Sequence, residues 1–260
     1  MFCGKCGTKI NDGDSYCTNC GAKAVKQSKR RKAELNNENE ESNVTHEKTE
    51  LSKQIKKVKC VDEYDKDVGT EMMEAVKFGS YEQSINKTNK TEPIEWLVLC
   101  KDEKNSKALL ISKYGLYDDN YDEEYRDFSG YEYVNWEECP LRKRLNEYFI
   151  NKAFTIEERE QIIDSNIINT GYKEYTSRDG NDTVDKIFLL SGDEAKKFFV
   201  SNKQRICFRA YDNNSICGWW IRTTIDGISR GIEEKGNLSR GEFTPYFTYS
   251  VRPAMWVKYK

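Results

Sequence analysis

The chain has 260 residues, a length that corresponds to one or two domains. It is 37% hydrophobic and holds 16 Tyr, 11 Phe and 5 Trp, enough apolar material for a folded core, which excludes a wholly disordered chain. The formal net charge of −2 is unevenly divided, because residues 1–60 hold 13 Lys and Arg against 8 Asp and Glu, whereas the remainder hold 29 against 36. The single histidine, His46, lies in a charged stretch, which argues against a Ser–His–Asp or Cys–His catalytic site in the folded part.

The sequence contains no apolar run near the ~20 residues that a bilayer span needs. Its first residues, MFCGKCGTKI, lack the apolar segment of a secretion signal. We therefore expect no membrane span and a cytoplasmic location.

The first segment, residues 1–24, contains two CxxC pairs with ten residues between them. Cys3, Cys6, Cys17 and Cys20 form the pattern of a tetrahedral site with four thiolates, which predicts one structural Zn²⁺. A disulfide pair is the alternative, and the expected reducing compartment argues against it. All four ligands are thiolates, so no coordination position is open for a catalytic water.

The two CxxC pairs and the residues around them resemble the bacterial zinc-ribbon family, whose motif is FCxxCGxxI…xFCxxCG. The resemblance covers about 22 residues and matches at every ligand, with Tyr16 where the family usually has Phe. An interaction module is the favoured role for the ribbon. Nucleic-acid binding through the ribbon and the basic residues 29–32 is the alternative, but acidic blocks follow this cluster at once and no aromatic lies near it for base stacking.

Residues 25–62 form a predicted charged linker. The segment has no aromatic residue, Gly or Pro up to residue 60, and it alternates basic and acidic blocks, so it cannot bury enough apolar surface to offset its ordering entropy. Within it, Leu51, Ile55 and Val58 have the spacing of a short amphipathic helix.

Residues 63–260 are predicted to form one α+β domain, because helices are followed by strands and do not alternate with them. Two apolar runs, residues 93–100 and 107–112, flank a polar turn and predict a β-hairpin. A helix is expected to begin near Asn135 and Pro140, with its buried stripe at Leu141, Leu145, Tyr148 and Phe149. Two capping boxes, Thr155 with Glu158 and Ser191 with Glu194, predict the starts of two further helices. Strands are expected over residues 186–190, 218–223 and 249–257.

Eight sequence blocks in order resemble an uncharacterised bacterial module, the domain-of-unknown-function family 6273, over nearly all of residues 74–258. The blocks are FGSYEQ, PIEWLVL, KALLISKYGL, NWEECPLRKRLNEYF, AFTIEER, DKIFLLS, WWIRT and SVRPAMWVK. Family members often carry an N-terminal zinc ribbon, as here, and many then have a transmembrane helix, which this sequence lacks. The family's usual WWLRSPG is replaced by WWIRTTI at residues 219–225.

The C-terminal WW…R…VRP pattern is also distantly similar to C-type-lectin-like domains of the formylglycine-generating type. In those domains a Trp-rich segment and a late Arg-containing strand frame the ligand surface. This resemblance implies a mixed, loop-rich α+β fold and implies no activity.

Trp219, Trp220, Arg222 and Arg252 are accordingly candidate ligand-binding residues, since Arg can hold a carboxylate or phosphate and Trp offers a stacking face. The alternative for all four is core packing. On a strand Trp219 and Trp220 point to opposite faces, so at most one can line a given cleft.

Five further cysteines, Cys60, Cys100, Cys139, Cys207 and Cys217, are expected to be free thiols. Formylglycine-generating enzymes keep an active cysteine pair in a region similar to that of Cys207 and Cys217, but the surrounding motif does not match.

The sequence predicts a non-catalytic zinc-binding protein, with the ribbon as an interaction module and the C-terminal domain as a module that binds a small ligand or a protein. One alternative is a hydrolase that works without histidine, using carboxylates of the acidic, Tyr-rich stretch 117–133; it would need two carboxyl groups with separated pKa values in one cleft. The other is nucleic-acid binding through the ribbon and basic linker, which the net negative charge of the large domain disfavours.

Overall fold

The fold is known from a computed structural model that describes residues 51–59, 72–83, 91–120, 135–169, 180–211, 215–225, 228–239 and 248–259. The chain divides into two units, residues 1–46 and 47–260, and all described residues belong to the second. The ribbon cysteines Cys3, Cys6, Cys17 and Cys20 lie outside the described residues, as does most of the acidic stretch 117–133.

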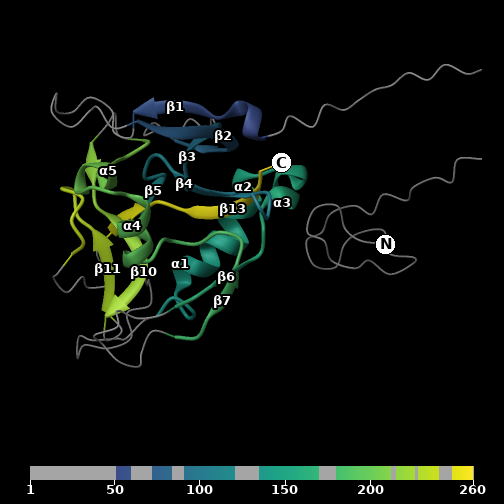
Figure 1. The fold of residues 1–260 in the computed structure, drawn as a ribbon. Coiled ribbons are helices and arrows are strands. Elements are labelled where there is room, and N and C mark those ends of the chain that lie inside the picture. Colours follow the sequence, from purple (N-terminus) through teal and green to yellow (C-terminus); the bar gives the residue numbers. More distant parts are fainter. Residues whose placement is uncertain are drawn as a thin grey trace, which may run out of the picture. The chain divides into compact units, whose positions relative to one another are not determined.

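A five-stranded antiparallel sheet forms the centre of the domain (Figure 1). Its strands lie in the order β1 (Lys56–Lys59), β2 (Met72–Glu82), β3 (Thr91–Asp102), β4 (Lys107–Ser112) and β13 (Ala254–Lys258). The predicted hairpin of β3 and β4 is confirmed. Its polar turn is held by Asp102, which accepts hydrogen bonds from the backbone and side-chain nitrogens of Asn105.

A second sheet of four strands contains the Trp-rich segment. Its strands lie in the order β11 (Ile228–Ile232), β10 (Trp219–Ile225), β12 (Thr248–Val251) and β5 (Tyr117–Asn120). β10 and β12 are parallel and the other pairs are antiparallel. Two small antiparallel pairs complete the strands: β6 (Ser165–Ile167) with β7 (Thr183–Asp185), and β8 (Cys207–Phe208) with β9 (Ile216–Cys217).

The helices are short. They are η1 (Leu51–Gln54, 3₁₀), α1 (Pro140–Lys143), η2 (Arg144–Phe149, π), α2 (Ile150–Ala153), α3 (Ile156–Gln161), α4 (Gly192–Phe198) and α5 (Asn202–Arg205). Both predicted capping boxes are confirmed, at Thr155 with Glu158 and at Ser191 with Glu194. Strands and helices together give a mixed, sheet-rich domain with few helices.

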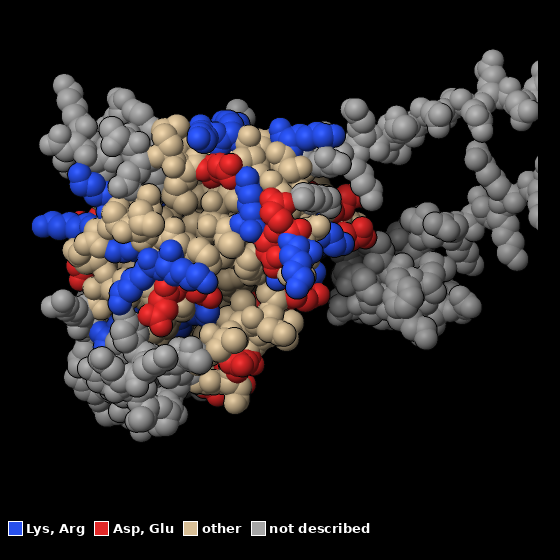
Figure 2. Space-filling view, viewed as in Figure 1, with Lys and Arg blue, Asp and Glu red and all other residues tan. Residues whose placement is uncertain are grey.

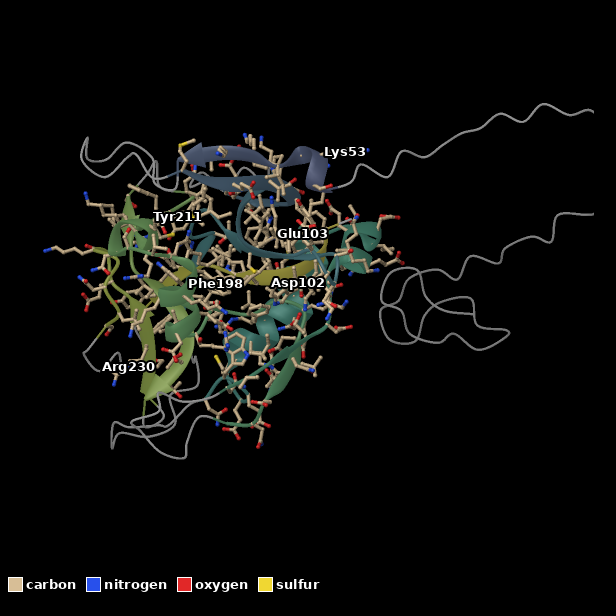
Figure 3. All side chains as sticks on the ribbon, viewed as in Figure 1. Lys53, Asp102, Glu103, Phe198, Tyr211 and Arg230 are labelled. Atoms are coloured by element: carbon tan, nitrogen blue, oxygen red, sulfur yellow. The ribbon has the colours of Figure 1, made fainter. Side chains whose placement is uncertain are left out.

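Aromatic side chains join the helices to one face of the first sheet. Phe154, which follows α2, packs on Phe78 of β2 and Trp96 of β3, with ring centroids 5.3 and 6.1 Å apart. The opposite face is buried as well, since Leu97 and Ile111 of neighbouring strands are fully buried. The sheet is therefore covered on both faces, and Figure 3 shows side chains filling the space between its strands and the helices.

Gly79 lies at a bulge of β2 against the same aromatic layer. Its φ is +66°, a region that only Gly enters without strain, and its N–H donates to Glu158 Oε1 at 3.1 Å. A Cβ at this position would lie 2.5 Å from the Phe154 ring.

The structure differs from the sequence expectations at four places. The segment 249–257, expected as one strand, forms two strands, β12 and β13, which belong to different sheets. Residues 51–59, placed in the linker and expected as a helix, form η1 and β1: β1 pairs with β2, and Leu51 is buried. The segment 186–190 is not a strand, because only Phe188 bridges to Ala254, and the strand lies earlier, at β7. Tyr148, expected in the buried stripe, is 59% exposed because the π turn η2 rotates it outward.

The described helices include none with the length and apolar character that crossing a membrane requires.

Candidate functional site

The two adjacent tryptophans of β10 point to opposite faces and both are fully buried. Trp219 Nε1 donates to the carbonyl of Arg205 at 2.9 Å, and Trp220 Nε1 donates to that of Asp119 at 2.8 Å. Each indole therefore uses its polar atom to tie β10 to another segment.

Arg222 connects β10 to the start of α4. Its guanidinium forms a bidentate ion pair with Glu194, with Nη2 2.9 Å from Oε1, and donates from Nη1 to the carbonyl of Leu189 at 2.8 Å. Glu194 is also the capping-box residue of α4. The pair thus fixes the helix terminus against the sheet.

Arg252 is a fully buried cation. Its guanidinium lies between the rings of Phe199 and Trp219, 5.1 Å from each centroid, and donates from Nε to the carbonyl of Ser112 at 2.8 Å and from Nη2 to that of Lys113 at 3.3 Å. Its Nη1 has no hydrogen-bond partner, and no carboxylate among the described residues forms an ion pair with it.

These four candidate residues do not frame a surface cleft. All are buried, and none lines either of the two cavities described below. Their positions favour the packing alternative that the sequence left open.

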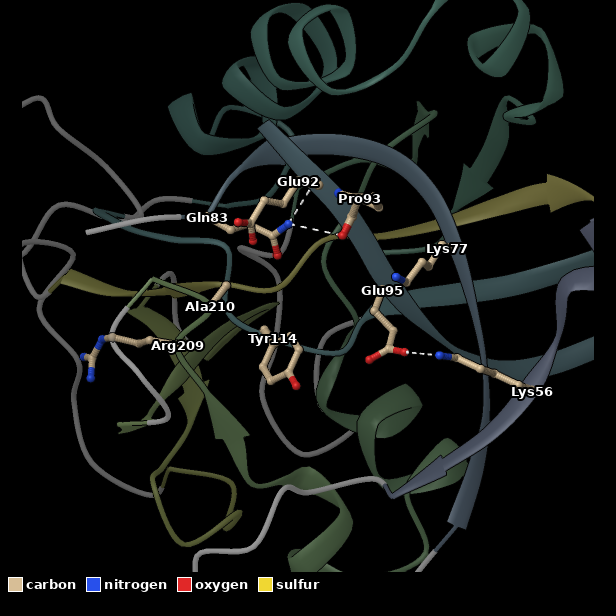
Figure 4. Close-up of a pocket in the computed structure, with 9 residues that line it drawn as sticks. All are labelled: Lys56, Lys77, Gln83, Glu92, Pro93, Glu95, Tyr114, Arg209 and Ala210. Atoms are coloured by element: carbon tan, nitrogen blue, oxygen red, sulfur yellow. Dashed lines mark hydrogen bonds and ion pairs between the residues drawn. The ribbon is translucent and has the colours of Figure 1, made fainter. Parts of the chain in front are cut away.

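A polar cavity of about 350 Å³ instead opens between the edge of the first sheet and the segment after β8 (Figure 4). It is lined by Lys56, Lys77, Gln83, Glu92, Pro93, Glu95, Tyr114, Arg209 and Ala210. Figure 2 shows basic and acidic side chains interspersed over the face of the domain in view. We call this cavity the sheet-edge pocket.

Glu95 forms the ion pairs of the sheet-edge pocket that involve its lysines. Its Oε1 lies 3.4 Å from Lys56 Nζ and its Oε2 lies 3.3 Å from Nζ of Lys113, a lysine that is only 7% exposed. Lys113 Nζ also donates to the Tyr114 hydroxyl at 3.0 Å. Lys77 is the cross-strand partner of Glu95. Three lysines thus surround one carboxylate, leaving excess positive charge at this end.

Two charged side chains of the pocket have no polar partner within the described structure. They are those of Lys77 and Glu92, which make no hydrogen bond or ion pair there. By contrast, Arg209 Nε is held by Asp118 Oδ2 at 3.0 Å, and Gln83 donates to the carbonyls of Glu92 and Pro93. An unpaired cation and an unpaired anion in one cavity are suited to a ligand that carries both charges.

Sequence reasoning missed the sheet-edge pocket because Lys56 was placed in the linker and the β2–β3 register was not known. The signal was present in part, since FGSYEQ and PIEWLVL flank the hairpin that carries Gln83 and Glu92.

Behind the wall of this pocket lies a pair of thiols. Cys207 and Cys217 are direct cross-strand partners on β8 and β9, both are free, and both are buried, which confirms the prediction of buried free thiols there. Cys217 Sγ donates to the carbonyl of Cys207 at 3.5 Å, and Cys207 Sγ lies 4.0 Å from the carbonyl oxygen of Lys113.

The two thiols titrate differently. Burial opposes ionisation of Cys207, but the hydrogen bond from Cys217, the positive charge of Arg252, the N–H of Gly115 and the charge of Arg209 together lower its pKa to about 7. The hydrogen bond with Cys207 and burial raise the pKa of Cys217 above its usual range.

The buried carboxylates of the described residues are paired with cations. Asp185 accepts from Arg142 Nε at 2.7 Å, Trp136 Nε1 at 2.9 Å and Thr183 Oγ1 at 2.7 Å. Asp185 and Arg142 also line a second cavity, of about 270 Å³. The carboxyl groups with a displaced pKa are partly or fully exposed, and Asp102 is an example: its hydrogen bond with Asn105 lowers its pKa.

No group of three or more metal-ligating side chains occurs in the part of the chain that the structure describes. The predicted zinc ligands lie outside it.

Comparison with protein-family models finds two matches. A zinc-ribbon domain matches residues 2–24, and a domain of unknown function (DUF6273) matches residues 105–259, more than half of the chain. The second match begins in the turn before β4, so β2 and β3 lie outside it although they complete the first sheet. No curated protein and no solved structure matches.

Proposed function

The chain belongs to the family of the domain of unknown function DUF6273, and on that premise we propose that it is a non-catalytic zinc-binding protein whose C-terminal domain binds a small zwitterionic ligand. The ribbon is an interaction module in this proposal. The observation that carries the ligand proposal is the pair of unpartnered opposite charges, Lys77 and Glu92, in the sheet-edge pocket.

The zinc-ribbon match implies zinc binding. The donor set fits the ion, because Cys3, Cys6, Cys17 and Cys20 supply four thiolates in two CxxC pairs, which is a closed tetrahedral structural site. Bound zinc would supply folding free energy to the ribbon and no open position for chemistry.

The separation of the two charges sets the size of the ligand. Glu92 is paired with Tyr81, four residues beyond Lys77 on β2, which corresponds to roughly 13 Å at about 3.3 Å per residue. Because β2 bulges between Lys77 and Ser80, the same span on β3, from Glu95 opposite Lys77 to Glu92, is only three residues or about 10 Å. An extended tripeptide has this length, with a free carboxylate for Lys77 and a free ammonium for Glu92. Tyr114 and Gln83 line the pocket and offer polar groups for the ligand's amides.

Binding is favoured over catalysis because the buried carboxylate Asp185 is fully paired and the carboxyl groups with a displaced pKa are ionised more readily than usual. Free thiols at Cys100, Cys139, Cys207 and Cys217 support a reducing, cytoplasmic location. A loop-rich C-type-lectin-like fold remains part of the proposal, with the ligand surface moved from the Trp–Arg segment to the sheet-edge pocket.

The test is calorimetric titration of the full-length, zinc-loaded protein with triglycine, N-acetyl-triglycine and triglycine amide. Triglycine is expected to bind, and blocking either end should weaken binding by about 1.4- to 5-fold, the value of an exposed ion pair. Lys77→Met should abolish the preference for a free carboxylate, and Glu92→Gln the preference for a free ammonium. Lys57→Met, an exposed lysine of β1 outside the pocket, is the matched control and should behave as the parent. No binding by triglycine, or equal binding by all three peptides, would rule out the proposal.

A further inference from the structure

Arg252 is a buried cation that lacks a carboxylate counter-ion among the described residues. Its contacts are two carbonyls and two aromatic faces, and Nη1 has no partner. Burying an uncompensated charge costs several kcal/mol, so a neighbouring group that can become an anion lowers that cost.

The thiol pair and this cation share neighbouring contacts. The carbonyl of Lys113 accepts from Arg252 Nη2 at 3.3 Å and lies 4.0 Å from Cys207 Sγ. Trp219, whose ring lies against the guanidinium, follows Cys217 by two residues on the chain. The groups that face Cys207 act in both directions. Arg252, Arg209, the thiol of Cys217 and the N–H of Gly115 favour the thiolate, whereas burial and the carbonyl oxygens of Lys113 and Phe208, 4.0 and 3.6 Å from the sulfur, favour the thiol.

Gly115 allows this close approach. A Cβ at residue 115 would lie 2.5 Å from Ser250 Cβ and 3.3 Å from Cys217 Sγ. The absence of a side chain therefore lets the backbone of residue 115 pass close to Cys217, while its N–H donates to the carbonyl of Phe208, the residue after Cys207, at 2.9 Å.

We propose that Cys207 and Cys217 form a peroxide-reactive dithiol, in which the Cys207 thiolate is the counter-ion of Arg252 and Cys217 is the resolving thiol. The Cys207 thiolate attacks hydrogen peroxide, so that an S–O bond forms, the O–O bond breaks, and hydroxide leaves and takes a proton to become water. Cys217 then loses its proton and attacks the sulfenic sulfur, so that the S–S bond forms and a second water leaves. The two thiols lose two electrons and the peroxide gains two.

The sheet-edge pocket is lined by residues close to Cys207 in the chain or in contact with its neighbours. Arg209 and Ala210, two and three residues after Cys207, line the pocket, and so does Tyr114, next to the Lys113 carbonyl that contacts the sulfur. Cys139 is equally buried but is not paired with another cysteine, and Cys100 is half-buried and unpaired, so both serve as internal references.

The test is mass spectrometry of the full-length, zinc-loaded protein after treatment with hydrogen peroxide. Trypsin cleaves after Arg205, Arg209 and Arg222, so the two cysteines fall in separate peptides, 206–209 and 210–222. The expected product is a disulfide that joins these peptides, formed before Cys100 or Cys139 is oxidised. In Cys217→Ser, dimedone should trap a sulfenic acid on peptide 206–209, whereas Cys207→Ser should give no adduct on Cys217. Cys139→Ser is the matched control and should leave the cross-link unchanged.

Arg252 is tested by the rate of Cys207 oxidation at pH 7. Arg252→Met should slow it about fivefold for the first unit by which the thiol pKa rises and about tenfold for each further unit. Arg252→Lys, which keeps the charge, should largely restore the rate. Circular dichroism shows whether Arg252→Met is folded. If the variant is unfolded, the oxidation rate of Arg252→Lys and the pH profile of the parent test the role of Arg252 instead. The profile should level off just above pH 7. Oxidation of Cys100 or Cys139 at the same rate as Cys207, or a profile that still rises at pH 9, would overturn the proposal.

Discussion

Asp185 offers the sharpest test of how this domain is held together. Its side chain is 1% exposed and accepts hydrogen bonds from Trp136, Thr183 and Arg142. Asp185→Ala leaves the fully buried Trp136 N–H without a partner, which costs about 1–3 kcal/mol, and removes the buried half of an ion pair. Arg142 is partly exposed and keeps its bond to the carbonyl of Glu137, which offsets part of the loss. The expected destabilisation is about 3 kcal/mol.

The assay is urea unfolding followed by circular dichroism and Trp fluorescence, on full-length protein. Asp185→Asn, which retains one acceptor oxygen, should fall between the parent and Asp185→Ala. The control is Asp164→Ala, because Asp164 is mostly exposed and lies 3.6 Å from Lys186, a surface pair worth about 0–1 kcal/mol. If Asp185→Ala and Asp164→Ala differ by less than about 1 kcal/mol, the buried network does not contribute as argued.

Three further outcomes are expected. Gly79→Ala should lower the free energy of unfolding by about 1–3 kcal/mol, because the substitution places a Cβ against Phe154 at a residue with positive φ. Chemical unfolding measures this change, and an unchanged midpoint would contradict the bulge geometry. Burial, with Tyr148, Glu82 and Asp119, raises the pKa of Tyr81 to about 12. The stability that the neutral phenol contributes below pH 10 should therefore decline as the pH rises from 10 to 12. Unfolding curves measured in parallel at alkaline pH should show this decline in the parent and not in Tyr81→Phe. Metal analysis should find one zinc per chain. Chemical blocking of the thiols should release the zinc, and Cys17→Ser should lower the zinc content. A zinc content of the parent clearly below one per chain would refute the four-thiolate site.

Local signals in the sequence predicted local structure well. The capping boxes at Thr155 and Ser191 depend on residues three apart, and the β3–β4 hairpin on two apolar runs around a polar turn, so neither needs knowledge of the fold. The strand β1 was missed because KKVK has the composition of a linker, and only pairing with β2 makes it a strand. Likewise, Lys186–Leu190 has an apolar pattern typical of a strand, yet the segment makes only one bridge to β13.

The site was less accessible to sequence reasoning, for a physical reason. Trp219, Trp220, Arg222 and Arg252 carry chemistry that suits a ligand, but the same groups stabilise a core when indole and guanidinium find carbonyl partners, and only burial separates the two roles. The sheet-edge pocket depends on Lys56, Lys77 and Glu95 meeting across three strands, which strand register determines. Pairwise spacing along the chain does not contain that register.

We expect the C-terminal domain to bind its ligand in the sheet-edge pocket and not at the Trp–Arg segment. The most direct measurement is the change in backbone amide chemical shifts of the full-length, zinc-loaded protein on titration with triglycine. The account predicts shifts concentrated at Lys77, Glu92, Glu95, Tyr114 and Arg209, the residues that line the cavity. Chemical-shift changes centred on Trp219 and Arg222 would contradict binding in the sheet-edge pocket. The absence of any change, at the triglycine concentrations used to compare Lys57→Met with the parent by calorimetry, would also contradict it.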